Sequence, residues 1–295
     1  MALNPNVVPY LGSGSYGLIL GFSPVGQSSA SGGGISVFLD LRPQSPPSIT
    51  AVVSAAALQQ ALSPGEVVSI FGTHLGIPST TTQFDSAGLY PTSVGFTPVT
   101  SQPGNTIVTF NGIPAPLLYV STDQINAQVP YEIAGQKNVN VVVTHNLQAS
   151  PPFTVPILDT SPGIFTVTQN GNGQGAILNA DITNPNIVTG NSASNPAAKG
   201  SGISIFATGS GLWNRTVQDG SILLDTMTRP TAPVSLTIGG QPARILYAGA
   251  APYLISGVLQ VNAIVPDNIG SGPQPLVLTV GQNSNVPQQV TVAVQ

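Results

Sequence analysis

The chain has 295 residues, a net charge of −4 and no cysteine, and its six basic residues are scattered. This composition excludes disulfides and thiolate metal sites, and it opposes nucleic-acid binding, which needs clustered Lys and Arg. No apolar run approaches the ~20 residues of a membrane-spanning helix. Short runs rich in Val, Ile and Thr, separated by frequent Gly and Pro, predict an all-β protein.

The first 47 residues contain two runs with strand character, Tyr16 to Phe22 and Ile35 to Leu41, separated by a Ser/Gly-rich stretch. We expect a short β-hairpin here, followed by a semi-rigid Pro-rich linker, RPQSPPS, at residues 42–48. The motif GSGSYG at residues 12–17 fits the dinucleotide pattern, but a strand follows it instead of a helix, so we interpret it as a turn. Residues 1–47 lack a signal-peptide pattern and are too short for a domain, so we expect the remnant of an upstream domain.

The Ala-rich stretch from Ala51 to Leu62 is the one place where the sequence predicts a helix, although it lacks clear caps.

The chain repeats once from Ile49 onward. PGEVVSIFGTHLG (residues 64–76) matches KGSGISIFATGSG (199–211), and DQINAQVP (123–130) matches LQVNAIVP (259–266). Between them, FNGIPAPLLYVS (110–121) matches IGGQPARILYAG (238–249), each with a two-residue hairpin signal near its start. Short strands at this spacing predict sandwiches. We therefore expect two tandem immunoglobulin-like β-sandwiches, residues 48–160 and 161–295, preceded by a short β-hairpin segment.

The same motifs carry a family resemblance. PGEVVSIFGTHLG, followed by VTFNGIPAPLLYVSTDQINAQVP, resembles the IPT/TIG type of immunoglobulin-like domain. The span from Ile49 to Gln295, with SPGIF, GQGAILNADIT and the closing LTVGQNSNVPQQVTVAVQ, resembles an uncharacterised C-terminal domain family of Solibacter and other acidobacterial secreted proteins. The resemblance implies an extracellular or cell-surface location and offers no activity to carry over. Ser54 and Trp213 depart from its pattern.

Residues that could support catalysis are sparse. His74 and His145 are far apart, no G-x-S-x-G motif occurs, and Asp219 and Asp225 share one loop. NADITNPN (residues 179–186) has one carboxylate, whereas calcium prefers several. We therefore expect no enzyme activity, no metal and no cofactor.

Three aromatic residues in loops are the candidate ligand-binding residues: Trp213, Tyr90 and Tyr253. Trp and Tyr are enriched at interaction hot spots, although packing over the end of a sandwich would explain them equally well. Tyr119 and Tyr247 occupy equivalent positions of the repeat, and we expect them in the core or at a corner.

The sequence favours a non-catalytic extracellular or cell-surface structural or adhesion module, which contacts proteins or glycans or acts as a spacer. One alternative is a self-assembling surface polymer that exchanges strands, with the N-terminal hairpin as donor. Another is a carbohydrate-binding accessory module of a secreted enzyme. Partners are then proteins, glycans or a second copy, without nucleic acid or a membrane span.

Overall fold

The computed structural model describes residues 14–21, 34–41, 45–77, 79–94, 105–180 and 188–295, with the side chains of the first two ranges excepted. The chain divides into two compact units, Met1–Ser45 and Pro46–Gln295. In the first, β1 (Gly14–Gly21) pairs antiparallel with β2 (Gly34–Leu41). These are the two predicted strands, except that Phe22 lies outside the described residues.

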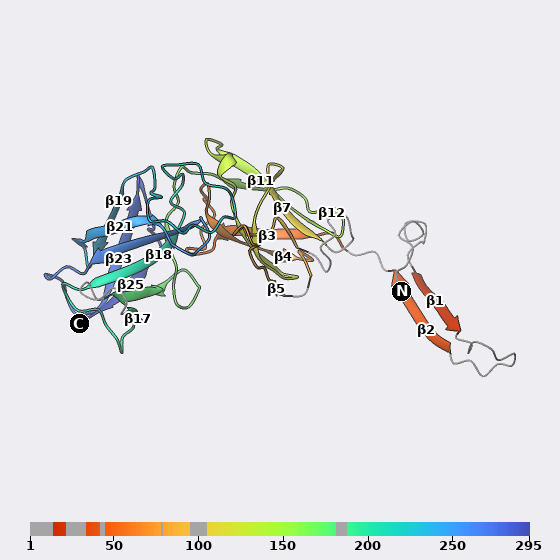
Figure 1. Cartoon of the computed structure of the whole chain (residues 1–295), viewed down its shortest axis with the longest axis horizontal. Helices are drawn as coiled ribbons and strands as arrows, with labels where there is room; N and C mark the ends of the chain where they lie inside the picture. The colour runs from red at the N-terminus through yellow and green to blue at the C-terminus, as the bar shows by residue number, and fades with distance from the viewer. Residues whose placement is uncertain (1–13, 22–33, 42–44, 78, 95–104, 181–187) are drawn as a thin grey trace. The chain divides into compact units, whose positions relative to one another are not determined.

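The second unit contains four β-sheets, consistent with two β-sandwiches. Its one described helical element is a single 3₁₀ turn, η2 (Tyr131–Ile133). No helix in the described part of the chain is long and apolar enough to cross a bilayer. Figure 1 shows the strands of the first sandwich in orange to yellow-green and those of the second in green to blue.

The predicted helix at residues 51–62 is wrong. A strand, β3, runs through Ser48–Ser54, and a turn follows it. Val52 and Val53 pair with Ile70 and Ser69 of the neighbouring strand. Both valines are buried. Pairing and burial of β-branched side chains thus override the helix propensity of the alanines that follow.

The first sandwich consists of a five-stranded and a six-stranded sheet. The five-stranded sheet has the order β3 (Ser48–Ser54), β4 (Val67–Thr73), β10 (Gln124–Gln128), β9 (Leu117–Val120), β5 (Thr80–Thr81). The other has the order β12 (Gln148–Ala149), β11 (Asn138–His145), β7 (Thr106–Phe110), β6 (Ser93–Val94), with β13 (Phe153–Pro156) on β11 and β8 (Ile113–Pro114) on β7.

The second sandwich consists of two six-stranded sheets. One has the order β17 (Val188–Gly190), β16 (Ile177–Ala180), β18 (Gly202–Thr208), β22 (Val258–Ile264), β21 (Arg244–Ala250), with β14 (Gly163–Ile164) on β18. The other has the order β15 (Gly173–Gln174), β25 (Val290–Val294), β23 (Gly272–Val280), β19 (Val234–Ile238), β20 (Gln241–Pro242), with β24 (Asn283–Ser284) on β23. Between the named strands of this sandwich, pairing is antiparallel except between β15 and β25.

The sequence repeat corresponds to a structural repeat. Ile70 lies opposite Ile125 in the first sandwich, and its counterpart Ile205 lies opposite Val261 in the second. All four side chains are fully buried. They belong to two separate hydrophobic cores, one in each sandwich. The matched motifs therefore occupy equivalent buried positions in the two copies, as the sequence repeat predicted.

Candidate functional site

The two sandwiches meet along a hydrogen-bonded junction. The Tyr90 amide donates to the Gly220 carbonyl (3.0 Å), and the Ile222 amide donates to the Gly88 carbonyl (2.8 Å). These bonds join a loop of the first sandwich to a loop of the second. Beside them lies a small apolar cluster whose buried members are Val67, Ala251, Ile255 and Val258. The junction is thus built like a small core.

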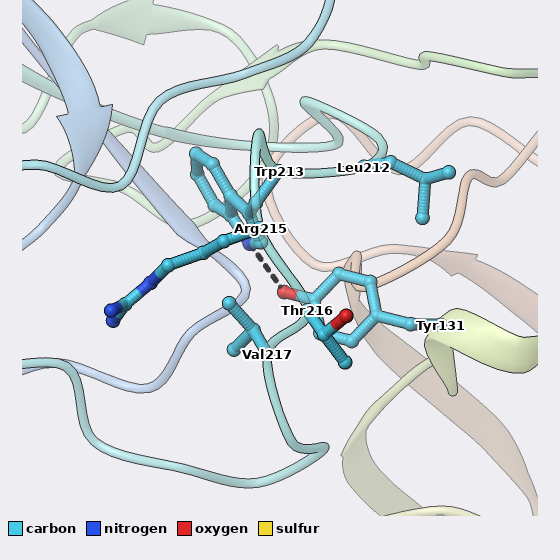
Figure 2. Close-up of a pocket in the computed structure, with 6 residues that line it drawn as sticks. All are labelled: Tyr131, Leu212, Trp213, Arg215, Thr216 and Val217. Atoms are coloured by element: carbon cyan, nitrogen blue, oxygen red, sulfur yellow. Dashed lines mark hydrogen bonds between the residues drawn. The ribbon is translucent and has the colours of Figure 1, made fainter.

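Tyr131 and Trp213 form the centre of this junction. Pro130 precedes η2 and leads directly to Tyr131, whose hydroxyl donates to the Ser256 carbonyl of the second sandwich (2.9 Å). The Trp213 indole Nε1 donates to the Tyr131 oxygen (2.6 Å) and also lies 3.0 Å from the Ser256 carbonyl. Burial raises the pKa of Tyr131 well above its usual value, so this phenol stays protonated. Figure 2 shows the indole directed at the phenol oxygen.

Gln128 adds a second buried connection. Its side-chain amide donates to Ser256 Oγ (3.0 Å), and its carbonyl oxygen accepts from the Gly220 amide (2.7 Å). The Val67 amide donates to Thr208 Oγ1 (2.8 Å), which in turn donates to the Gly257 carbonyl (2.7 Å). A buried polar group that loses its partner and gains no water in exchange incurs its full desolvation penalty. These bonds therefore oppose a displacement of one sandwich against the other.

Glu66 is fully buried beside these bonds. One carboxyl oxygen, Oε2, accepts from the amide (2.8 Å) and the hydroxyl (3.1 Å) of Ser63. The other, Oε1, has no hydrogen-bond partner among the described residues. Burial raises the pKa of Glu66 to about 8, although hydroxyls of Ser54 and Ser63 oppose part of the rise. The carboxyl is therefore protonated at neutral pH.

Asp219 and Glu132 place two carboxyl groups at the rim of the junction. Asp219, from the second sandwich, accepts from the Tyr131 amide (3.0 Å) through Oδ1. Burial, with a smaller contribution from the adjacent carboxyl of Glu132, raises the pKa of Asp219 to about 7. Asp219 therefore keeps its proton to a higher pH than an ordinary aspartate does.

The turn at Gly209 is tightly packed, against Ser161 of its own sandwich and Glu66 of the other. Gly209 has a φ of +82°, and a Cβ there would lie 1.9 Å from the Ser161 carbonyl oxygen and 3.3 Å from the Glu66 carboxyl carbon. The repeat places His74 at the equivalent position of the first sandwich, where it is exposed and also has a positive φ, +56°. Both copies make the same left-handed turn, but only the copy inside the junction requires glycine.

A pocket of about 220 Å³ opens beside the Tyr131–Trp213 contact. Figure 2 shows its six lining residues: Tyr131, Leu212, Trp213, Arg215, Thr216 and Val217. Arg215 is engaged by Asp225 at 2.5 Å. A second pocket, of about 300 Å³, shares Leu212 and includes Asp159, Thr160 and Pro64. No group of three His, Asp or Glu side chains able to hold a metal occurs among the described residues.

The three predicted ligand-binding residues lie in different environments. Trp213 is 5% exposed and lines the pocket from inside the junction. Tyr90 is half-buried, with its ring edge-to-face against Phe84 at a centroid distance of 5.9 Å. Tyr253 is 75% exposed, on a backbone with a φ of +67°. Only Trp213 lines the pocket, and its indole is occupied by bonds within the protein.

The other singled-out residues have structural roles. His145 Nδ1 lies 2.9 Å from Thr106 Oγ1, and burial lowers its pKa. Tyr119 and Tyr247 lie opposite Asn126 and Asn262 on neighbouring strands, equivalent to each other but outside both cores. Of the two placements expected for them, core or corner, the structure excludes the core. Most of the Asn179–Asn186 loop lies outside the described residues.

Sequence reasoning missed Glu66, Gln128, Tyr131 and Ser256 as junction residues. One signal was available at Glu66: a charged residue directly before the buried run VVSIF, at a position where the second copy has Ser201. A carboxyl group next to a buried strand needs a polar contact, so its presence in one copy alone indicates an additional contact there that the second copy lacks. The other three residues carry no local signal, because their partners lie in the opposite sandwich.

Comparison with known proteins locates one family in the chain. The IPT/TIG domain family matches residues 47–157, which cover the first sandwich. Among solved structures, the chain is similar to SGBP-B of the Bacteroides ovatus mixed-linkage glucan utilization locus, in complex with a mixed-linkage heptasaccharide, at 15% identity and a TM-score of 0.33. That match covers 97% of this chain and 55% of the other, so the chain spans about half the length of that protein. No curated protein matches. The first sandwich is thus an IPT/TIG domain within an all-β chain.

Proposed function

We propose that the chain is a non-catalytic structural module of the cell exterior that presents two sandwiches as one rigid body for protein or glycan contacts. The observation that carries this proposal is the hydrogen-bonded junction around Tyr131, Trp213 and Ser256. IPT/TIG domains are typically non-catalytic. The resemblance of residues 49–295 to acidobacterial secreted proteins supports the location, and residues 48–160 and 161–295 are the two proposed domains.

Rigidity follows from the chemistry of the junction. Gln128 and Thr208 are fully buried and use their polar atoms across the junction, so separation would expose several groups to water at once. Each such bond contributes about 0.5–1.5 kcal/mol, and leaving one partner buried and unpaired costs about 1–3 kcal/mol. A small apolar cluster adds to this. The arrangement therefore favours one fixed orientation over a flexible tether.

Calorimetry and small-angle X-ray scattering of the whole chain test this proposal. We expect residues 46–295 to unfold in one cooperative transition and to scatter as a single fixed pair of sandwiches. Gly209→Ala should split the transition or broaden the distribution of distances. Gly112→Ala is the matched control, because Gly112 has a similar φ of +85° but a Cβ added there would have no atom within 4 Å. Two independent transitions in the wild type would contradict the proposal.

Glycan contact is a second candidate function, favoured by the exposed ring of Tyr253. A residue with a Cβ and a positive φ is uncommon, and here the strained backbone presents an aromatic ring to solvent. A glycan array with the wild type, Tyr253→Ala and the exposed control Leu147→Ala tests it. We expect Tyr253→Ala alone to lose binding. No binding by the wild type would end this candidate. Trp213→Ala is a poorer test, because it also breaks the junction.

Self-assembly through the N-terminal hairpin is a third candidate. Strands β1 and β2 pair only with each other among the described residues, and an isolated two-stranded sheet is marginally stable in water. Size-exclusion chromatography with and without residues 1–47 tests it. We expect the full chain to elute as an oligomer and the shortened chain as a monomer, and a monomer in both cases would remove the idea.

A further inference from the structure

The junction encloses acidic groups without basic partners. Glu66 lies at its centre, and Asp219 and Glu132 meet at its rim, one from each sandwich. No salt bridge involves any of the three among the described residues, where the one recorded pair is Arg215 with Asp225. Among the described residues, none of these acids has a basic partner that would compensate a developing charge.

We infer that the junction is a proton-dependent latch, closed while Glu66 and Asp219 hold their protons and loosened when they lose them. This inference rests on the proposed rigid pairing of the sandwiches and adds a regulation to it. The latch is the contact between the sandwiches, and each sandwich keeps its own core in either state.

The surroundings of Glu66 explain why its charge would act on the junction. The groups that the structure shows beside it are neutral: Ser54 and Ser63 on its own side, and Gly209 on the other. Tyr131, the titratable residue packed on the adjacent Gly65, stays protonated. Oε1 has no partner among the described residues, so an ionised carboxylate would lack solvation until water reached it, and Gly209 of the other sandwich covers it.

The repeat provides an internal comparison. Ser201 occupies the position of Glu66 in the second sandwich, and its hydroxyl donates to the Ala198 carbonyl of its own turn (2.6 Å). The turn therefore folds without a carboxyl group. Glutamate occurs only in the copy whose turn is covered by another sandwich, so the acid is not a requirement of the sandwich fold.

Asp219 and Glu132 act in the same direction. They face each other across the rim, and Asp219 binds the amide of Tyr131, so its position is tied to η2. The residues that face Asp219 are Glu132, a like charge, and the neutral phenol of Tyr131. Loss of the Asp219 proton places a negative charge beside the Glu132 carboxyl of the opposite sandwich, and like charges there repel each other.

Trp213 supplies a specific readout, because it is the sole tryptophan and lies in the junction. The experiment records its emission maximum, the far-ultraviolet circular dichroism and the small-angle scattering of the full chain from about pH 5 to about pH 9.5. We expect a red shift with a midpoint between about 7 and about 8, the pKa values of the two buried acids, with unchanged circular dichroism. The distribution of interatomic distances from the scattering should broaden over the same pH range.

Three variants identify the groups. Glu66→Gln and Asp219→Asn should each reduce the red shift, and the double variant should abolish it. Asp267→Asn, which removes an exposed carboxylate away from the junction, should leave the wild-type shift in place. If the double variant does not fold, the wild-type titration still decides.

The outcomes separate the latch from the rigid pairing. Emission and scattering that stay constant from about pH 5 to about pH 9.5 in the wild type would overturn the latch and leave the rigid pair intact. Independent sandwiches already at about pH 5 would overturn the rigid pairing itself. A red shift that persists unchanged in the double variant would also overturn the latch, because other groups would then cause it.

Discussion

The indole Nε1 of Trp213 donates to the phenol oxygen of Tyr131 across 2.6 Å, and the two residues belong to different sandwiches. The same phenol donates to the Ser256 carbonyl, so one oxygen connects the first sandwich to two segments of the second. Buried networks of this kind specify one arrangement, because each member loses its partner if the geometry changes. The orientation of the sandwiches thus depends on a few identifiable atoms.

Tyr131→Phe removes the phenol oxygen and preserves the ring. We expect the free energy of unfolding to fall by about 1–3 kcal/mol, because Trp213 and Ser256 each lose a buried partner. Urea denaturation followed by Trp213 fluorescence measures it. Tyr119→Phe is the control, since its phenol oxygen shares a hydrogen bond with the exposed Ser79 Oγ, away from the junction. Equal losses in both variants would contradict a special role for Tyr131.

Gly209→Ala tests the close backbone contact. Left-handed backbone alone costs a residue with a Cβ about 1–2 kcal/mol. Gly112→Ala should lose that amount, whereas Gly209→Ala should lose clearly more, because the new Cβ would meet the Ser161 carbonyl oxygen. Chemical denaturation of both variants provides the comparison. Similar losses of stability in the two variants would mean that the turn at Gly209 accommodates a Cβ without further destabilisation.

Thr208→Val replaces a hydroxyl by a methyl group of similar size. The Val67 amide and the Gly257 carbonyl then lose their partner inside the junction, and we expect a loss of about 1–3 kcal/mol. Thr109→Val, on β7 away from the junction, controls for the general effect of valine in a strand. A loss no larger than that of the control would show that water replaces both bonds.

The pH dependence of stability should be opposite to ordinary acid denaturation. The folded-state pKa values of Glu66 and Asp219 are raised to about 8 and about 7, so the folded chain holds protons that the unfolded chain releases. Stability is therefore fully present below about pH 4 and decreases as pH rises through about 7 to 8. Urea midpoints across this range measure it, and Glu66→Gln should flatten the curve. A midpoint that rises with pH would contradict this sign.

The sequence predicted the repeat well because its signals are local. Strand period, hairpin turns and the shared SIF motif place Ile70 and Ile205 in matching buried positions, as the register confirms. The same reasoning failed at Ala51–Leu62, where alanines suggest a helix and pairing with β4 imposes a strand. Helix propensity depends on the local sequence and takes no account of pairing with a strand that is distant along the chain.

The junction was beyond prediction for a related reason. Trp213 stood out as an aromatic loop residue, but its partner Tyr131 lies 82 residues away and showed nothing unusual in its own segment. Gln128 and Ser256 are likewise ordinary strand-end and loop residues until the sandwiches meet. Contacts between two separately patterned halves depend on tertiary docking, which single-sequence periodicity does not encode.

The two copies differ in sequence where they contact each other, so the two sides of the contact are not interchangeable. The turn of the first sandwich contributes Glu66 to the contact, and the turn of the second contributes Gly209, whereas their counterparts Ser201 and His74 lie outside the contact. Another copy of the second sandwich placed after it would meet serine where glutamate is needed. Contact of this kind therefore joins one first-type sandwich to one second-type sandwich, and the same contact cannot repeat along a series of identical domains.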